Sequence, residues 1–479
     1  MKPALSNIGK DFLGGTKPLL LFLLVTVSVS CAALFAAGLN KIPLFIIGGL
    51  IGLIILYYCL VHAYIGFFIV TTICFFTAYP ERILKMEIPI STGIEVLMVC
   101  LFVGSHLFIR KKIDQGPFYK SAISFAFFLY LLLTCIEFFN PDMYSIAGWF
   151  FFLRRFIMFM FIYIVSYRLF DTTDKLKFFF KFWIFLAFVT ALYACFQQFF
   201  GLLPFEMDYL MSNPHEYKLY FQGGTIRKFS FVSDPTTLGI LEGSSSVFVL
   251  ILAINEKIKK RKVLLFFVFF VLLLGMTFSG TRTANIMLPA ALCLYALLTI
   301  TNKTTLVTIL VFFLTATFIL FGPIQNSSIN RIRSTFDKKE ESGAVRDMNR
   351  KYIQPYIYAH PIGGGISTSG VLGEKYNPGH PLAGFPPDSG LLLAAIELGW
   401  IGYAITILVY ILILYQCIHY YFQTNNDRNK ILIVAVTGSI FSIIITQYSQ
   451  VSIGQLPTAL FFYAALAMVI RLKELGQNP

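Results

Sequence analysis

Charged side chains are scarce in this chain. Aspartate, glutamate, lysine and arginine make up only 13% of its 479 residues, whereas 57% of the residues are hydrophobic and 52 are phenylalanine. Soluble domains carry roughly twice this charge, so the composition excludes a soluble protein and predicts a polytopic membrane protein. The net charge of +14 then indicates basic cytoplasmic loops, and no nucleic-acid partner is expected.

The chain also lacks cysteines in its long polar stretches. All eight lie in apolar runs, as Cys31, Cys59, Cys74, Cys100, Cys135, Cys195, Cys293 and Cys417. This placement argues against a disulfide framework and against metal-ligand spacing, so neither a metal nor a cofactor is expected. The sequence shows no internal repeat at a fixed period and no soluble domain at either end.

Apolar runs of about 17 to 25 residues are long enough to cross a bilayer. They occur near 19–37, 43–60, 62–79, 93–109, 121–139, 147–167, 178–199, 237–254, 263–279, 284–301, 305–322, 400–421, 431–448 and 455–471. Since the second and third runs are short and closely joined, about 12 to 14 spans are expected. The fold class is therefore predicted to be all-α, a polytopic membrane helical bundle whose first span is not cleaved.

Basic residues in short loops predict the orientation, because cytoplasmic loops are enriched in lysine and arginine. With the N-terminus inside, the cytoplasmic loops are the basic ones, at 110–112, 168–181, 257–262, 303, 428–430 and 471–473. An even number of spans also places the C-terminus in the cytoplasm. The segments 200–236, 280–283 and 323–388 then all face outward, so the polar clusters of interest share one side of the membrane.

The longest polar interval divides the chain into three parts. Residues 1–322 hold spans and the outer loop 200–236, residues 323–388 form one large extracytoplasmic loop, and residues 389–479 hold a short half-helix and the last spans. The large loop contains too many aromatic and apolar residues to be disordered. We expect it to cover a site for an anionic, lipid-linked substrate.

The exit from the large loop predicts a broken helix. Residues 389–421 are too long for one straight span at 1.5 Å per residue. Gly399 is expected to separate a short helix, Ser389 to Leu398, from a full span that begins at Trp400. The positive N-terminal end of the short helix would then point at the outer cavity.

Arginines near the predicted outer face are candidate phosphate ligands. Arg346 and Arg350 lie four residues apart and would share one helix face. Arg227, in TIRKFSFVSDPTTLG, and Arg282, in MTFSGTRTA, lie beside predicted span ends. Guanidinium is permanently charged and bidentate, which suits a diphosphate. The alternative is a solvated helix face for the first pair and an interfacial anchor for the other two.

Three other titratable residues near the loop exit are candidates. Asp388, in PPDSG, is suited to accept a proton from an acceptor hydroxyl; alternatively it is a helix N-cap. Glu397 lies in an apolar helix, where an ionisable group indicates function, such as orienting an acceptor or pairing with an arginine. His380, in NPGHPLAGF, is either an alternative base or a loop residue satisfied by backbone.

Two consecutive arginines lie inside the sixth predicted span. Arg154 and Arg155 are about two turns below its outer end. They either extend a basic cavity downward, as accessory residues, or reach up to the interface. Glu137 and Glu242 are their candidate partners.

Four stretches occur in an order that is similar to a known family. TIRKFSFVSDPTTLG and MTFSGTRTA precede RIRSTFDKKEESGAVRDMNRKYIQPYIYAHPIGGG, which leads to PPDSGLLLAAIELGWIGY. Together with the topology, these motifs resemble the O-antigen ligase and polymerase superfamily, membrane glycosyltransferases of the GT-C type. The resemblance covers residues 200 to 420. Asp388 stands where the family has a His-Asn pair, and the tryptophan that often follows the loop arginine is absent.

The resemblance implies a metal-independent, inverting glycosyltransferase in the bacterial inner membrane, with its active site facing the periplasm. It would transfer a glycan from an undecaprenyl-diphosphate-linked donor to an acceptor hydroxyl. Arg227 and Arg346 would bind the diphosphate with help from Arg282 or Arg350, and Asp388 would take the proton. The predicted catalytic residues are Asp388, Arg346 and Glu397.

Several acceptors and one transport function stay open. Lipid A-core as acceptor would make the protein an O-antigen ligase, and a second lipid-linked repeat would make it a polymerase. A protein serine would make it an oligosaccharyltransferase. A flippase for the same lipid-linked glycan is a different class, but transporters place ionisable residues near the midplane in two related halves, which this sequence lacks. A scaffold for an assembly complex would leave every arginine dispensable.

Overall fold

A computed structural model describes residues 41–85, 89–108, 116–222, 224–300 and 341–477, together with isolated positions between 307 and 333. The first predicted span, most of the eleventh and most of residues 324–340 lie outside the described residues. Among the cytoplasmic loops predicted to be basic, residues 110–112 and 303 also lie outside them. The other predicted spans fall almost entirely within the described part of the chain.

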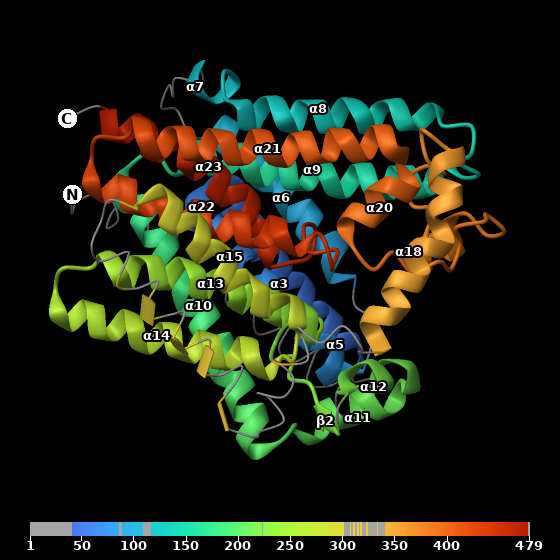
Figure 1. The fold of residues 1–479 in the computed structure, drawn as a ribbon, viewed down its shortest axis with the longest axis horizontal. Coiled ribbons are helices and arrows are strands. Elements are labelled where there is room, and N and C mark those ends of the chain that lie inside the picture. Colours follow the sequence, from blue (N-terminus) through green and yellow to red (C-terminus); the bar gives the residue numbers. More distant parts are fainter. Residues whose placement is uncertain are drawn as a thin grey trace, which may run out of the picture.

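Long apolar helices make up most of the described structure (Figure 1). They are α3 Lys41–Val61, α4 Ala63–Phe75, α6 Ile90–Leu107, α8 Ala122–Ile136, α9 Ile146–Leu169, α10 Thr173–Phe200, α13 Pro235–Asn255, α14 Lys259–Phe278, α15 Arg282–Leu298, α21 Gly399–Gln423, α22 Asp427–Thr446 and α23 Thr458–Gln477. Among the described residues, 8 helical stretches are long and apolar enough to cross a membrane. The all-α polytopic class is therefore confirmed, whereas the number of spans and the side of each terminus stay predictions.

The remaining elements lie between these apolar helices, and all of them except the helix Glu341–Ala359 are short. They are α5 Tyr79–Leu84, α7 Gly116–Tyr119, the 3-10 turn η1 Glu137–Phe139, α11 Pro204–Ser212, α12 Pro214–Tyr220, β1 Phe221–Gln222, β2 Thr225–Ile226, α18 Glu341–Ala359, α19 Gly370–Tyr376 and α20 Gly390–Glu397. The sequence did not predict the antiparallel β1–β2 pair. Gly224, at φ +76°, allows the tight turn between these strands because it has no Cβ.

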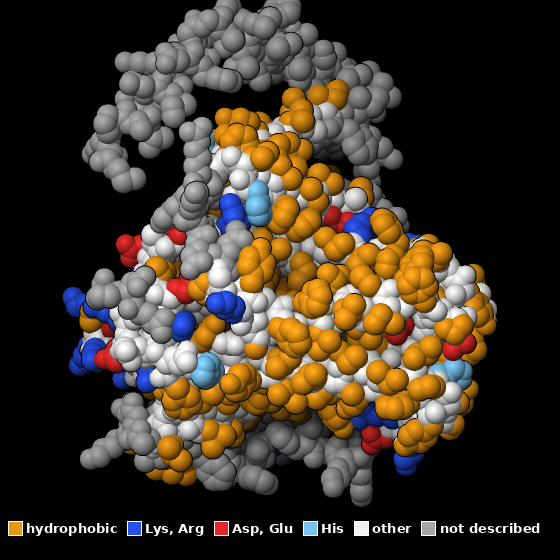
Figure 2. Space-filling model, turned by 90° about the horizontal axis from the view of Figure 1, so that it is seen from above, with side chains coloured by type: hydrophobic (Ala, Val, Ile, Leu, Met, Phe, Trp, Pro, Cys, Tyr) orange, Lys and Arg blue, Asp and Glu red, His pale blue; other side chains and the backbone are white. Residues whose placement is uncertain are grey.

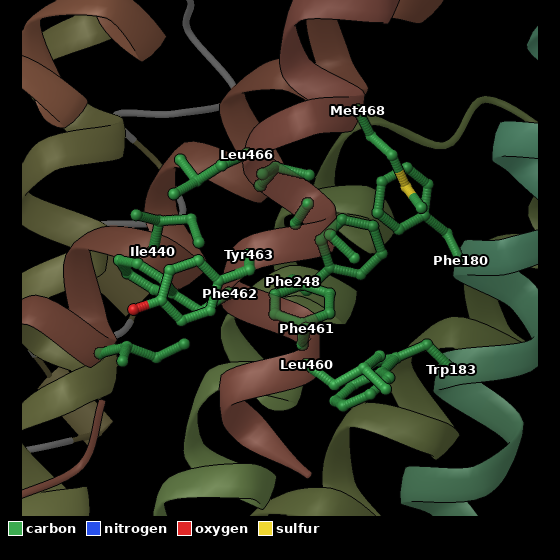
Figure 3. Packing of buried hydrophobic residues seen from close by; sticks show 14 of the residues in the cluster. Phe180, Trp183, Phe248, Ile440, Leu460, Phe461, Phe462, Tyr463, Leu466 and Met468 are labelled. Carbon is green, nitrogen blue, oxygen red and sulfur yellow. The ribbon is translucent and has the colours of Figure 1, made fainter. Parts of the chain in front are cut away.

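The core is built around α13 and α23. Every residue from Ala459 to Ile470 of α23 is buried, and its aromatic side chains interleave with those of α10 and α13 (Figure 3). In α13, glycines allow close approach: a Cβ added at Gly239 would lie 2.6 Å from Ser279 Oγ, and one at Gly243 would lie 2.6 Å from Met287 Sδ. Small residues at helix contacts are the usual means of tight packing in membranes.

The outer surface fits a bilayer. Figure 2 shows hydrophobic side chains across the middle of one face, with most charged side chains toward its edges. Exposed apolar residues on α14, such as Val263 and Phe267, are 62% and 55% accessible. In water such a surface would drive aggregation, so lipid is its natural solvent.

One end of the bundle carries the polar loops, and we refer to it as the loop end. Helices α5, α11, α12, α18 and α20 all lie there, on the right in Figure 1. Hydrogen bonds join loops that are distant in sequence, including Lys228 N to the Phe278 carbonyl at 3.1 Å and Gly390 N to the Gln450 carbonyl at 3.2 Å. This gathering is what the predicted topology requires; which side of a membrane the loop end faces stays a prediction.

Candidate active site

The chain is broken between α20 and α21, as the sequence predicts. Helix α20 ends at Glu397, and α21 begins at Gly399, whose φ of +66° changes the direction of the chain. A Cβ at this position would lie 2.1 Å from the Pro361 carbonyl oxygen, so only glycine fits. The same stretch of the large loop pairs with the end of α20, because Gly364 N donates to Ile396 O and Gly365 N to Glu397 O, both at 2.9 Å. The large loop thereby fixes the direction of α20.

Glu397 ends α20 and holds the loop that follows the glycines. Its carboxylate accepts hydrogen bonds from Ser367 N at 2.9 Å, from Ser369 N at 3.2 Å and from Ser369 Oγ at 2.5 Å. Burial raises the pKa of Glu397 to about 7, while the three donors act in the opposite direction. Since no arginine pairs with it within the described chain, the contacts favour a positioning role over the predicted catalytic one.

Asp388 lies immediately before α20. The N-cap of this helix is Ser389, whose Oγ accepts from Leu392 N at 3.0 Å, so the alternative that Asp388 is the N-cap is wrong. The Asp388 side chain is partly exposed, and Asn349 Nδ2 lies 3.5 Å from its Oδ2. A carboxylate in this position is accessible and oriented by an amide, as a general base needs to be.

Helix α18 carries Arg346 about one turn before Asn349, the residue that contacts Asp388. Ile353 of α18 packs against Leu392 and Ile396 of α20, which fixes the side of α18 that faces the site. Arg346 precedes Asn349 by three residues, or about one helical turn. Arg346 is partly buried and makes no hydrogen bond or ion pair with any described residue. A guanidinium that has no partner within the described chain is a candidate to bind an anion.

Arg350, unlike Arg346, is bonded to another residue of the described chain. Its guanidinium stacks on the Tyr448 ring at 4.6 Å and donates to the Tyr448 hydroxyl at 3.1 Å and to the Tyr448 carbonyl at 3.0 Å. It therefore attaches α18 to the loop after α22. These contacts favour a positioning role for Arg350 instead of the predicted direct role in binding diphosphate.

Arg227 and Arg282 meet at the turn between α14 and α15. Arg227 Nε donates to the Ser279 carbonyl at 2.9 Å, and its Nη2 donates to Thr281 Oγ1 at 3.0 Å. Arg282 is the first residue of α15, and the charge of Arg346 acts on it. Arg227, Arg282 and Arg346 form what we term the arginine cluster. The structure thus brings together three of the predicted phosphate ligands from three distant parts of the chain.

His380 is a buried loop residue that bonds to the backbone. This agrees with the second sequence interpretation and not with a role as the base. It is 4% exposed, and its Nδ1 accepts from Leu382 N at 3.1 Å. Its ring lies edge-on to Tyr144 with centroids 4.9 Å apart. Burial lowers the pKa of His380, against a raising effect from Asp142. A buried imidazole that already accepts a backbone hydrogen bond is poorly placed to serve as the base.

Arg154 and Arg155 point to different sides of α9. Arg154 Nε forms an ion pair with Glu95 Oε2 of α6 at 2.8 Å, and Arg155 Nη2 donates to the Gly454 carbonyl at 2.9 Å. The predicted partners were wrong. Glu137 instead accepts from Asn140 Nδ2 at 2.8 Å, and Glu242 is fully buried within α13.

Two structural residues of the site were not predicted. Arg82 of α5 donates to the carbonyls of Ser230, Val232 and Ser233 at 3.0, 2.6 and 2.8 Å, which shapes the loop that carries Arg227. Asn140 Nδ2 donates to the Ile362 carbonyl at 3.0 Å and so ties the α8–α9 loop to the large loop. No sequence pattern indicates either residue, because each contact joins segments that are far apart in the chain.

The site combines three clustered cations with an accessible carboxylate at the loop end of the bundle. Within the described residues there is no group of three or more His, Cys, Asp or Glu side chains that could hold a metal ion. The arrangement suits binding of a phosphate-rich group next to a proton acceptor.

Comparison with known families identifies the segment that forms most of this site. Residues 265–407 match the family model described as O-Antigen ligase. The matched segment includes Arg282, Arg346, Asp388 and Glu397, but not Arg227. A search of curated proteins found no match. The family match confirms the prediction made from the loop motifs, and it supports the O-antigen ligase superfamily as the family of this chain.

Proposed function

We propose that this protein transfers a glycan from an undecaprenyl-diphosphate-linked donor to an acceptor hydroxyl at the outer face of the inner membrane. The family match points to glycosyl transfer of the ligase or polymerase type. The observation that carries the finer proposal is the contact between Asn349 and Asp388 at 3.5 Å. Arg346 of the arginine cluster lies on the same helix, about one turn before Asn349.

The arginine cluster would bind the donor diphosphate. Arg346 acts on Arg282 as a like charge, and a bound dianion would relieve this repulsion. As the bond from the sugar C1 to the diphosphate oxygen breaks, negative charge grows on the leaving group. Guanidinium groups already in place stabilise this charge more in the transition state than in the ground state, which is the requirement for catalysis.

Asp388 would be the general base. Its carboxylate takes the proton of the acceptor hydroxyl while the hydroxyl oxygen attacks C1 and the diphosphate leaves from the opposite face. The anomeric configuration is therefore inverted. Asn349, at 3.5 Å, orients the carboxylate. In this chain aspartate would thus replace the histidine that stands at the equivalent place in the resembling motif.

The acceptor decides between two reactions. Attack by a lipid A-core hydroxyl would be O-antigen ligation, and attack by a second lipid-linked glycan would be polymerisation. The arginine cluster and Asp388 serve both reactions equally, because they act on the donor and on the acceptor proton.

The test is turnover by the purified full chain of a defined undecaprenyl-diphosphate-linked glycan, with lipid A-core or a second donor molecule as acceptor. Asp388→Asn should lower turnover about 10²–10⁴-fold, the range for a general base. It should leave donor binding and the melting temperature unchanged. The matched control is Glu374→Gln, which neutralises an acidic residue of α19 within the same loop and should keep wild-type turnover. Equal turnover by Asp388→Asn and wild type would refute the proposal.

A further inference from the structure

A cavity of about 330 Å³ lies among α8, α9, α20, α21 and α23. This volume is at the lower end of the roughly 300–1,000 Å³ usual for ligand pockets. The loop after α22 contributes Gln447, Gly454 and Gln455 to its wall. The cavity is separate from the arginine cluster, none of whose members lines it.

The cavity changes from polar to apolar with depth. Ser367 and Glu397 line it at the loop end, and Phe159 and Ile413 line it deeper among the spans. Phe159 follows the start of α9 by 13 residues, or about 20 Å at 1.5 Å per residue. An occupant that matches this gradient has a polar head toward the loop end and an apolar chain toward the membrane interior.

Arg155 provides a positive charge within the wall of this cavity. Its one hydrogen bond within the described chain goes to the Gly454 carbonyl at 2.9 Å, and no described carboxylate forms an ion pair with it. A guanidinium has five N–H donors, so most of the hydrogen-bonding capacity of Arg155 is open to an occupant. Glu95 attracts Arg155 without forming an ion pair with it. A cation in a mainly apolar pocket is stabilised by an anion in direct contact.

Arg154, the residue before Arg155, differs from it because it is paired with a carboxylate. Arg154 faces a groove between α6 and α9 and is neutralised by Glu95 at 2.8 Å. Consecutive residues lie about 100° apart around a helix, so the pair serves two different surfaces. Of the two, Arg155 alone reaches the cavity.

We infer that this cavity binds a second anionic lipid, with its phosphate at Arg155 and the first part of its apolar chain against Phe156, Phe159 and Ile413. The inference rests on the proposed function, because it assigns this lipid as the acceptor. Helix α20 separates the two sites: Gly390, Leu393 and Ala394 line the cavity, while Leu392 and Ile396 pack toward α18.

The placement favours an acceptor that is itself a lipid phosphate. A donor held by the arginine cluster and an acceptor held at Arg155 would approach Asp388 from the two sides of α20. Such an arrangement joins two lipid-linked glycans, so it favours the polymerase reaction over ligation to another kind of acceptor.

The binding test uses geranyl phosphate, with geraniol and inorganic phosphate as comparison probes, on the purified full chain. Arg155→Gln should weaken geranyl phosphate binding about 10- to 100-fold, the loss expected for charge-assisted hydrogen bonds. The matched control is Arg154→Gln, which should bind as wild type does. Geraniol and inorganic phosphate should each bind more weakly than geranyl phosphate, because geraniol lacks the phosphate and inorganic phosphate lacks the apolar chain.

A second pair of variants tests the cavity without touching its charge. Val409→Trp should fill the cavity and reduce geranyl phosphate binding, because Val409 lines it and is 5% exposed. Leu408→Trp, at a position 44% exposed, should not. Wild-type binding by both Arg155→Gln and Val409→Trp would overturn the inference, as would geraniol binding as tight as that of geranyl phosphate.

Turnover separates this inference from the proposed function. With two lipid-linked substrates, Arg155→Gln should raise the KM for the acceptor and leave the binding of donor unchanged. If Asp388→Asn retains full turnover, the proposed function fails whatever Arg155 binds. If Asp388→Asn is inactive but Arg155→Gln uses a lipid-linked acceptor with an unchanged KM, the proposed function stands and the acceptor site is refuted.

Discussion

Arg82 and Arg346 lie at the same end of the bundle in opposite environments. Arg82 is 1% exposed, stacks on the Phe229 ring at 4.3 Å and donates to three backbone carbonyls. Arg346 bonds to no described residue and lies near another arginine. An arginine that donates to several backbone carbonyls holds a loop in shape, whereas one placed near a like charge is suited to bind a substrate anion reversibly.

The largest expected effect is on the stability of the Arg82 region. Arg82→Ala would leave three carbonyls without their donor, and those of the buried residues Ser230 and Val232 would cost about 1–3 kcal/mol each. We expect a melting temperature many degrees lower and little folded protein on size-exclusion chromatography. Lys85→Ala is the control, since its ion pair with Asp208 is 60% exposed on both sides and worth about 0–1 kcal/mol. Equal melting of Arg82→Ala and Lys85→Ala would contradict the comparison.

Substitutions in the arginine cluster should lower activity but leave stability unchanged. Arg346→Ala should lower kcat by about 10²–10³-fold through the lost stabilisation of the leaving group. Its melting temperature should stay at the wild-type value, because Arg346 makes no bond to the described part of the fold. Lys351→Ala, at an exposed position of the same helix, is the matched control for kcat. A marked loss of stability in Arg346→Ala would show that Arg346 has a structural role like that of Arg82.

Substitution of Arg350 should lower turnover less than substitution of Arg346, because Arg350 holds α18 in position and does not bind the substrate itself. Arg350→Lys keeps the charge but loses the two hydrogen bonds and the stacking on Tyr448, which a lysine cannot reproduce. We expect about a tenfold loss of turnover, or about 1.4 kcal/mol in the barrier. Tyr448→Phe, which removes only the hydroxyl, should cost less. If Arg350→Lys is as inactive as Arg346→Ala, Arg350 contacts the substrate after all.

The smallest effect concerns pH. Burial raises the pKa of Glu397 from 4.5 to about 7, so the folded state holds this proton more tightly than the unfolded chain does. The resulting stability is fully present below about pH 4.5 and is lost as the pH rises through 7. Between pH 6 and 8 the loss should be about 1 kcal/mol, measured as a falling melting temperature. Glu397→Gln should lack this slope, and a slope that persists would exclude Glu397 as its source.

Much of the architecture could be predicted from the sequence, whereas the partners of single side chains could not. Apolar length predicted the helices, and Gly399 predicted the break between α20 and α21. The pairing of Arg154 with Glu95 was missed, because a helix that is apolar all round has no amphipathic stripe to show which side faces inward. Rotation about the helix axis, and with it the surface that each of the two arginines faces, is set by packing alone.

The sequence could predict which arginines lie near one another in the candidate site, but not which of them bonds to another part of the protein. Arg227, Arg282 and Arg346 were expected near one another, and the structure brings them together. Arg350 lies four residues from Arg346 but bonds to Tyr448, which is 98 residues away in the chain. Spacing on a helix can place two cations on one face, but it cannot indicate which of them a distant loop will occupy.

The burial of α23 has a consequence for how the protein is made. This helix is synthesised after every described helix that it packs against, including α9, α21 and α22. During translation, these earlier helices enter the membrane with the faces that α23 will cover still open to lipid or to insertion factors. Stalling the ribosome before residue 458 should therefore yield inserted but unfinished bundles, which proteases would remove.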